Sequence, residues 1–136
     1  MTAADTNAAL RGHEFLPHHI AVTIPAIYAT EDVPMLDKVV HAHYFIGSSD
    51  WWLFEYDPEG QRALAFVCLG DPQLAEVGYI YLPELEAVRI PVEIAGEQVQ
   101  LVIERDIHWE PKPVSIAVPK PLHRSWWQSA EEPTTT

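Results

Sequence analysis

From Lys38 the hydrophobic pattern follows a period of two, which is typical of β-strands, and residues 62–69 form a nearly continuous apolar run, which is typical of a central strand. Clusters of glycine, serine, aspartate and proline separate the alternating stretches, as the short turns of an antiparallel meander do. In the first stretch Val40, Ala42, Tyr44 and Ile46 share one face. The pattern predicts strands over residues 38–46, 51–56, 62–69 and 77–82.

The stretch after this meander combines a helical turn with a hairpin. Residues 83–88 begin with proline and carry two acidic residues, which favours one or two helical turns. Residues 92–94 and 99–103 form the arms of a predicted hairpin, whose second arm runs on to Asp106. The sequence therefore predicts an α+β fold: a single domain with a curved antiparallel sheet of five or six strands and one or two short helices.

The two ends differ from this central region. Residues 1–16 are small and polar and predict a flexible leader, before a core domain over residues 17–113. Residues 18–24, between two prolines, favour an extended segment because they are rich in β-branched side chains; a short helix is the alternative. Residues 114–136 form a proline- and tryptophan-rich extension that cannot join a regular ladder, and its end is expected to be disordered. The extension either packs back on the sheet or docks on a partner.

Three aromatic or thiol positions allow predictions about the core. Phe66 and Tyr79 are expected to face inward on neighbouring strands, and Cys68 to be a buried, inert thiol. The adjacent Trp51 and Trp52 should lie on opposite faces of their strand. Because Cys68 is the single cysteine, an internal disulfide and a zinc site with several thiolates are excluded.

The chain is strongly acidic, with 20 Asp and Glu against 8 Lys and Arg and a net charge of −12. The whole net charge falls within residues 31–110. Such a surface repels phosphate backbones, so direct nucleic-acid binding is not expected, and it attracts a basic protein surface. Solubility alone is the alternative explanation. No apolar run reaches the roughly 20 residues that cross a bilayer and no secretory signal is visible, so a cytoplasmic protein without membrane contact is expected.

Two histidines are the first candidates for chemistry. His41 and His43 stand two apart on a predicted strand, so both rings leave the same face and could share a metal ion, with Asp37 or Glu55 as a further ligand. A polar strand face is the preferred interpretation, because the chain lacks a helical histidine pair. We therefore expect no metal and no cofactor.

Four carboxylates are the second candidates. Glu55 and Asp57 share one strand face and Glu104 and Asp106 share another; if the strands pair, the four could hold a divalent cation or act as the acid and base of a hydrolase. Structural pairing is preferred over catalysis, since Arg105 between two acids is typical of an ion pair that fixes strand ends.

Acidic residues and tryptophans are the candidates for binding, because tryptophan is enriched at interface hot spots. The candidate binding residues are Glu31, Glu55, Asp57, Glu84, Trp51, Trp126 and Trp127.

The order of short motifs resembles the domain of unknown function 2958 family. Residues 24–31 (Ile-Pro-Ala-Ile-Tyr-Ala-Thr-Glu) open the resemblance, which continues through Trp51-Trp52-x-x-Glu55-Tyr56-Asp57 to Glu104-Arg105-Asp106 and spans about residues 24–113. Members of that family are short proteins of plasmids, phages and other mobile elements, with no assigned activity. The shared framework that the resemblance implies consists of Tyr28, Glu31, Glu55, Asp57, Glu84, Glu104, Arg105 and Asp106.

The hypothesis from sequence is a non-catalytic accessory binding protein of a mobile genetic element, with an acidic face that engages a basic protein partner in a counter-defence role. One alternative is a small metal-dependent hydrolase that uses the four carboxylates. The other is an adaptor that docks through its Trp/Pro-rich tail. The oligomeric state does not follow from the sequence.

Overall fold

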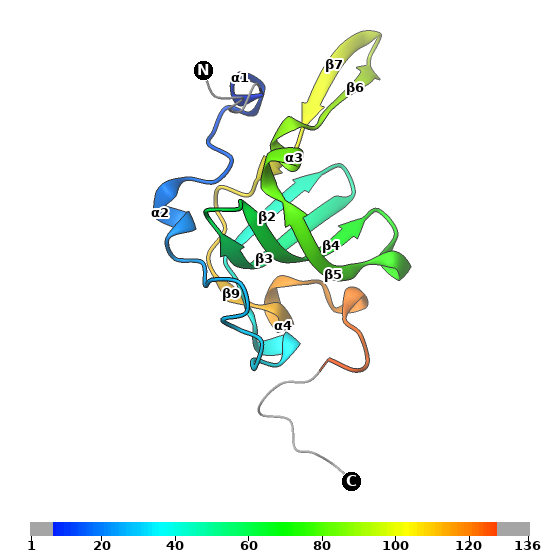
Figure 1. The fold of residues 1–136 in the computed structure, drawn as a ribbon. Coiled ribbons are helices and arrows are strands. Elements are labelled where there is room, and N and C mark those ends of the chain that lie inside the picture. The colour runs from blue at the N-terminus through cyan, green and yellow to red at the C-terminus, as the bar shows by residue number, and fades with distance from the viewer. Residues whose placement is uncertain (1–6, 128–136) are drawn as a thin grey trace.

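The computed structural model describes residues 7–127 and has a five-stranded antiparallel sheet at its centre, in the order β5-β4-β3-β2-β8 (Figure 1). The long strands β3 (Ser49–Asp57) and β4 (Arg62–Leu69) form the middle, because their nearly continuous apolar residues need a core on both faces. The outer members are β2 (Ala42–Ile46), β5 (Glu76–Tyr81) and β8 (Glu104–Arg105). The α+β class and the five-stranded antiparallel sheet predicted from the sequence are confirmed.

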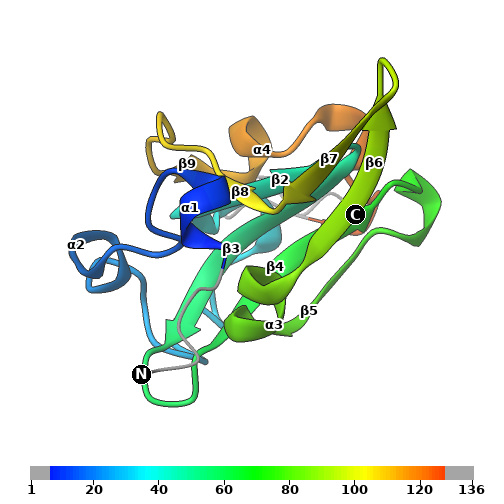
Figure 2. The same ribbon diagram turned by 90° about the horizontal axis from the view of Figure 1, so that it is seen from above.

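Two small ladders and several short helices surround this sheet. The hairpin of β6 (Arg89–Ile94) and β7 (Glu97–Val102) forms its own sheet and projects away from the main one (Figures 1 and 2). Strand β1 (Val39–Val40) pairs with β9 (Lys112–Pro113). The helices are α1 (Ala8–Arg11), α2 (His18–Ala21), α3 (Leu82–Ala87) and α4 (Val114–Ala117), with 3₁₀ turns η1 (Met35–Asp37), η2 (Pro72–Leu74) and η3 (Lys120–Leu122).

Each face of the main sheet carries its own core. The first core joins Trp51, Leu53 and Ala65 of the sheet to Phe15 of the N-terminal segment and Leu82 of α3. Tyr44 closes this core, since its hydroxyl donates to the Phe15 carbonyl at 2.7 Å. The sheet therefore supports the N-terminal segment and α3 on one side.

The C-terminal segment covers the second core. Trp52, Phe54 and Phe66 of the sheet pack with α4 and with Trp127, whose ring meets that of Phe66 edge-on at 5.0 Å. Of the two alternatives for the extension, the described part up to residue 127 packs back on the sheet. Trp51 and Trp52 lie on opposite faces and Cys68 is buried, as predicted.

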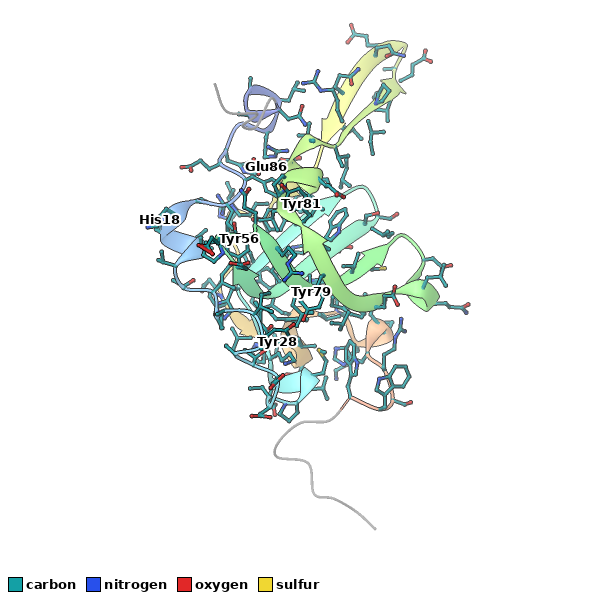
Figure 3. The ribbon with its side chains drawn as sticks, viewed as in Figure 1. His18, Tyr28, Tyr56, Tyr79, Tyr81 and Glu86 are labelled. Carbon is teal, nitrogen blue, oxygen red and sulfur yellow. The ribbon has the colours of Figure 1, made fainter. Side chains whose placement is uncertain are left out.

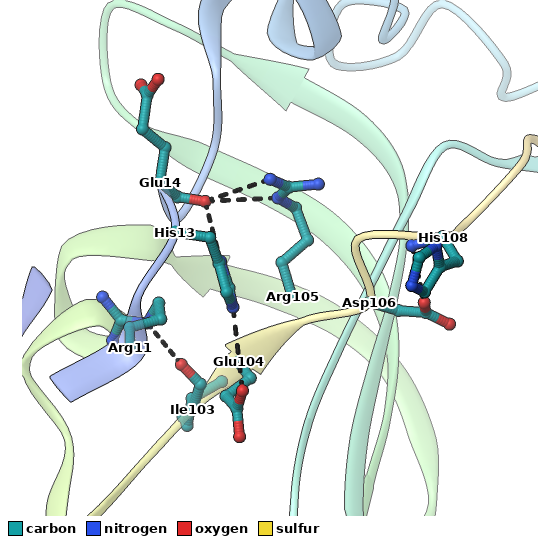
Figure 4. Close-up of polar contacts among 8 residues, drawn as sticks. All are labelled: Arg11, His13, Glu14, Ile103, Glu104, Arg105, Asp106 and His108. Atoms are coloured by element: carbon teal, nitrogen blue, oxygen red, sulfur yellow. Dashed lines mark hydrogen bonds and ion pairs between the residues drawn. The ribbon is translucent and has the colours of Figure 1, made fainter.

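The described part of the expected leader is packed rather than flexible. Asn7, Arg11 and Phe15 are buried, and the Arg11 Nε donates to the Ile103 carbonyl at 2.6 Å (Figure 4). The polar composition of this segment was misleading, because its amide and guanidinium groups bind backbone carbonyls of a distant part of the chain.

Three local predictions are wrong. Residues 18–24 contain helix α2 instead of an extended segment, since the Pro17 carbonyl accepts from the amides of Ile20 and Ala21, and no strand among the described residues 7–127 pairs with this segment. The strand over residues 38–46 is interrupted at His41, whose amide donates to Leu53. The second hairpin arm does not continue past Val102; β8 leaves the hairpin and pairs with β2.

The core prediction is half right. Phe66 is buried, whereas Tyr79 is 49% exposed. Tyr79 lies on β5 at the edge of the sheet, where alternate residues are only partly covered.

Candidate functional site

Most of the basic side chains are held by contacts within the same chain, although only Arg11 and Lys38 among them are buried. Seven of the eight Lys and Arg residues bind a backbone carbonyl, a side-chain oxygen or an aromatic ring. Arg105, for example, donates to the Glu14 carbonyl at 3.3 Å, and Arg124 to the Ala75 carbonyl at 2.6 Å (Figure 4 shows the first). The ion pair that the sequence predicted for Arg105 is thus replaced by a bond to a backbone oxygen.

The negative charges lie mostly outside. Ten of the sixteen acidic residues within residues 31–110 are exposed. They lie in turns and loops, on β5 and β8, and on the β6–β7 hairpin; Glu31 is in a turn before η1 and Glu84 is in α3. Because acidic residues outnumber basic ones, these exposed carboxylates give the surface a negative charge.

A groove runs beside β5 on the face of the first core. It has a volume of about 310 Å³, and Leu69, Leu74 and Ile80 form much of its apolar lining. Asp71 and Glu76 are exposed at its border. Leu69 and Leu74 are 67% and 76% exposed, which is unusual for two large aliphatic side chains that lie together.

The other face of β5 presents tyrosines. Tyr79 and Tyr81 alternate on this strand and are both exposed, and Tyr28 reaches Tyr79 from a loop (Figure 3). The Tyr79 side chain is hydrogen-bonded to that of Tyr28; partial desolvation and then this contact raise the pKa of Tyr79 above its usual value. Arg62 lies over the Tyr79 ring at 5.4 Å. We call β5 with this groove and these tyrosines the β5 surface.

The buried carboxylate of Glu55 holds the Tyr28 loop. It is 1% exposed and accepts from the Tyr28 amide at 2.8 Å, from the Thr30 amide at 3.0 Å and from the Thr30 hydroxyl. Tyr28 has a φ of 73°, a left-handed conformation that is strained for a bulky residue and persists only where contacts enforce it. Glu55 is thus a positioning residue for Tyr28.

Lys38 completes this buried cluster. Its ammonium donates to the Thr30 carbonyl, and to the Thr30 hydroxyl at 2.9 Å. Burial lowers the pKa of Lys38, while the charges of Glu55 and Glu31 act in the opposite direction. A β-bulge between Leu53 and Glu55 shifts the register of β3 at this point.

The structure does not bring the four predicted carboxylates together. Register places Glu104 level with Asp50 across β2, so Glu55 lies five residues along β3 from that level, about 17 Å away at the usual rise per residue. Asp57 is farther along β3, and its carboxylate caps the Glu59 amide at 3.0 Å. These positions give no support to the hydrolase alternative.

The two candidate histidines have separate surroundings. His43 binds the Asp50 carboxylate at 2.8 Å, lies 3.7 Å from that of Asp106 and stacks on Trp52. Burial lowers the pKa of His41, whose Nδ1 is enclosed without a hydrogen-bond partner. Within residues 7–127 no group of three or more His, Cys, Asp or Glu side chains is arranged to hold a metal ion.

The other predicted binding residues differ in whether their side chains are exposed to solvent. Trp51, Trp127 and Glu55 are buried and therefore do not contribute to a contact surface. Trp126 is 73% exposed beside a groove of about 570 Å³ that also contains Glu76 and Val77 of β5. Sequence reasoning missed Tyr28, Tyr79 and Tyr81 as surface residues; Gly78 in the middle of a strand was the available signal.

Comparisons with family models, with curated proteins and with solved structures found no match. The resemblance noted in the sequence stays a prediction. Over the described residues, no helix is long and apolar enough to cross a membrane.

Proposed function

We propose that this protein is a non-catalytic binding protein that engages a basic protein partner through the β5 surface. The observation that carries the proposal is the acidic surface: ten carboxylates of residues 31–110 are exposed, whereas most basic side chains bind carbonyls and rings of the same chain. A basic partner would supply the missing positive charge, and electrostatic attraction would speed its association.

The groove fits a lysine or arginine side chain of such a partner. These side chains place an apolar stem on apolar surface and keep the charged head at its border. Leu69, Leu74 and Ile80 offer the apolar lining, and Asp71 and Glu76 lie where the charged head would end. The groove thus combines the two chemistries that a long basic side chain requires.

The biological setting that we propose rests on the sequence resemblance alone. It is that of an accessory protein of a mobile genetic element, acting in the cytoplasm in a counter-defence role. Proteins that handle nucleic acid carry basic surfaces, and an acidic protein would compete for them without binding DNA itself.

The adaptor alternative keeps one supporting observation, the exposed Trp126 ring. If the protein is an adaptor that docks through its tail, the Trp126→Ala variant should no longer bind the partner. The binding protein proposed here would lose little, because Trp126 lies outside the groove that holds Asp71.

The test compares two double variants with the same net charge. Asp71→Asn with Glu76→Gln removes charge at the groove, and Glu93→Gln with Glu97→Gln removes it at the far hairpin (Figure 1). The probe is a fluorescent lysine-rich peptide, with its Kd measured by anisotropy at several salt concentrations.

We expect the groove variant to weaken binding about three- to tenfold at moderate salt, the effect of two exposed charge contacts. The hairpin variant should change it less than about twofold, since its charges lie on the projecting hairpin and do not line the groove, and salt screens charges over a Debye length of about 8 Å. Equal losses for both variants, or a Kd that does not depend on salt, would contradict the proposal.

A further inference from the structure

Strand β5 is an open edge of the main sheet. It pairs with β4 on one side, and within residues 7–127 no strand pairs with its other side. At the opposite edge, β8 has two residues, whereas β5 has six. The hairpin β6–β7 projects past the end of β5 without covering it (Figures 1 and 2).

The register identifies the backbone groups that face outward. The Leu82 amide donates to the Gln61 carbonyl at 3.0 Å, so these two residues form a hydrogen-bonded pair next to the Arg62–Tyr81 pair. Hydrogen-bonded and non-hydrogen-bonded pairs alternate along an antiparallel ladder. Tyr81, Tyr79 and Val77 therefore direct their N–H and C=O groups away from β4, toward the open edge.

The edge lacks several of the usual devices that block strand pairing. Proteins protect long edges with proline, with lysine, with inward charges or with a covering element. Strand β5 contains neither proline nor lysine, and it pairs with β4 over six residues without a register shift. Gly78 lies in the middle of β5, and a Cβ added at this glycine would meet no atom within 4 Å. A glycine inside a strand often marks close approach of another backbone.

We infer that β5 receives an extended basic segment of the partner protein as an added strand. This inference rests on the proposed function and specifies how the partner binds. Backbone pairing to Val77, Tyr79 and Tyr81 gives the affinity, and alternate side chains give the specificity. One set of the segment's side chains lies over the groove at Asp71 and Glu76, and the other lies on the side of Tyr79 and Tyr81, whose exposed rings offer apolar contact.

A second copy of this chain is a poor occupant of the same edge. Two copies would bring together two surfaces that each belong to a protein of net charge −12. Like charges in contact oppose association. The charge thus favours a basic segment over self-pairing.

The first experiment follows amide hydrogen exchange by NMR with a blocked peptide of alternating lysine and threonine as the probe. In the free protein the amides of Val77, Tyr79 and Tyr81 should exchange fast, and those of Gly78 and Ile80 slowly. Adding the peptide should slow the first three. The control peptide has the same sequence with N-methyl groups on alternate residues, which keeps the charge and removes strand-pairing donors.

The second experiment compares Tyr79→Pro with Tyr79→Ala. Both lose the ring, but proline also removes the outward amide, while the preceding glycine tolerates it. Proline should weaken peptide binding about tenfold more than alanine does, the effect of one backbone hydrogen bond of about 1.4 kcal/mol. Urea unfolding of both variants checks that the fold is intact. If a variant does not fold, the exchange experiment on the unaltered protein still tests the inference.

The outcomes separate the two proposals. Protection of the three amides together with weak binding of the N-methylated peptide supports strand addition. Equal, salt-dependent binding of both peptides without protection overturns strand addition and leaves the proposed function standing. No salt-dependent binding of either peptide overturns both, and a dimer of the free protein that protects the same amides overturns the basic occupant.

Discussion

Replacing Glu55 with glutamine tests whether this buried carboxylate supports the fold rather than a reaction. The change keeps the shape of the side chain but removes its charge and turns one oxygen into a donor. That donor then faces the amides of Tyr28 and Thr30, which lie 2.8 and 3.0 Å from the carboxylate oxygens. At least one amide loses its acceptor in an interior where Glu55 is 1% exposed.

The magnitude follows from these contacts. Each hydrogen bond to a charged group contributes about 1.5–3 kcal/mol, and contributions within one cluster do not add fully. Removing one partner of a buried charge cluster costs about 3–5 kcal/mol, because Lys38 keeps its buried charge. We therefore expect Glu55→Gln to lower the free energy of unfolding by about 3–5 kcal/mol.

Urea unfolding, followed by the fluorescence of the 5 tryptophans, measures this change. The matched control is Asp57→Asn, two residues along β3, where the half-buried carboxylate caps only the Glu59 amide. The control should cost less than about 1 kcal/mol. A loss below about 1 kcal/mol for Glu55→Gln would refute the positioning role. If Lys38 and Glu55 belong to one cluster, the double variant Lys38→Met with Glu55→Gln should lose less unfolding free energy than the sum of the losses in the two single variants.

Three further predictions concern the second core and His41. Phe66→Ala should cost about 3–5 kcal/mol in urea unfolding, since the ring is buried between Trp52 and Trp127; a change under about 1 kcal/mol would contradict the core assignment. Trp127→Ala should cost about 3–5 kcal/mol and Trp126→Ala less than about 0.5 kcal/mol, so similar losses would mean that the C-terminal segment is placed wrongly. Burial lowers the pKa of His41 from 6.5, so the unfolded chain takes up a proton first and stability should fall as the pH drops below 6.5. Below pH 6.5, His41→Gln should reduce the slope of unfolding free energy against pH. An unchanged slope would mean that His41 does not cause this pH dependence.

Strand β4 was predictable as a central strand because its nearly continuous apolar run is typical of a strand that is buried on both faces. Strand β4 has apolar residues on both faces, and a strand between two cores needs them. Helix α2 was only the second choice for residues 18–24, because the β-branched residues that favour a strand lie mostly after it, at residues 22–24, and local composition does not show that this segment pairs with no strand within residues 7–127.

The candidate site was less predictable, since its contacts join distant positions. Glu55 binds residues 25 and 27 positions earlier in the chain, and no spacing rule connects them. Charge excess was visible in composition, but only the structure showed that arginines such as Arg11 and Arg124 bind carbonyls. Edge position, which exposes Tyr79, depends on the strand order of the whole sheet.

The two coverings of the sheet come from opposite ends of the described chain, and this separation affects how the protein forms during synthesis. Arg11 reaches the Ile103 carbonyl across 92 residues, and Trp127 closes over Phe66 as the last described residue. A ribosome-bound chain that has completed β5 therefore holds Trp52, Phe54 and Phe66 on an uncovered face. Such a nascent chain is a substrate for chaperones and prone to aggregation until the C-terminal segment emerges. Contacts of this sequence separation also slow folding, because the chain must close long loops before they form.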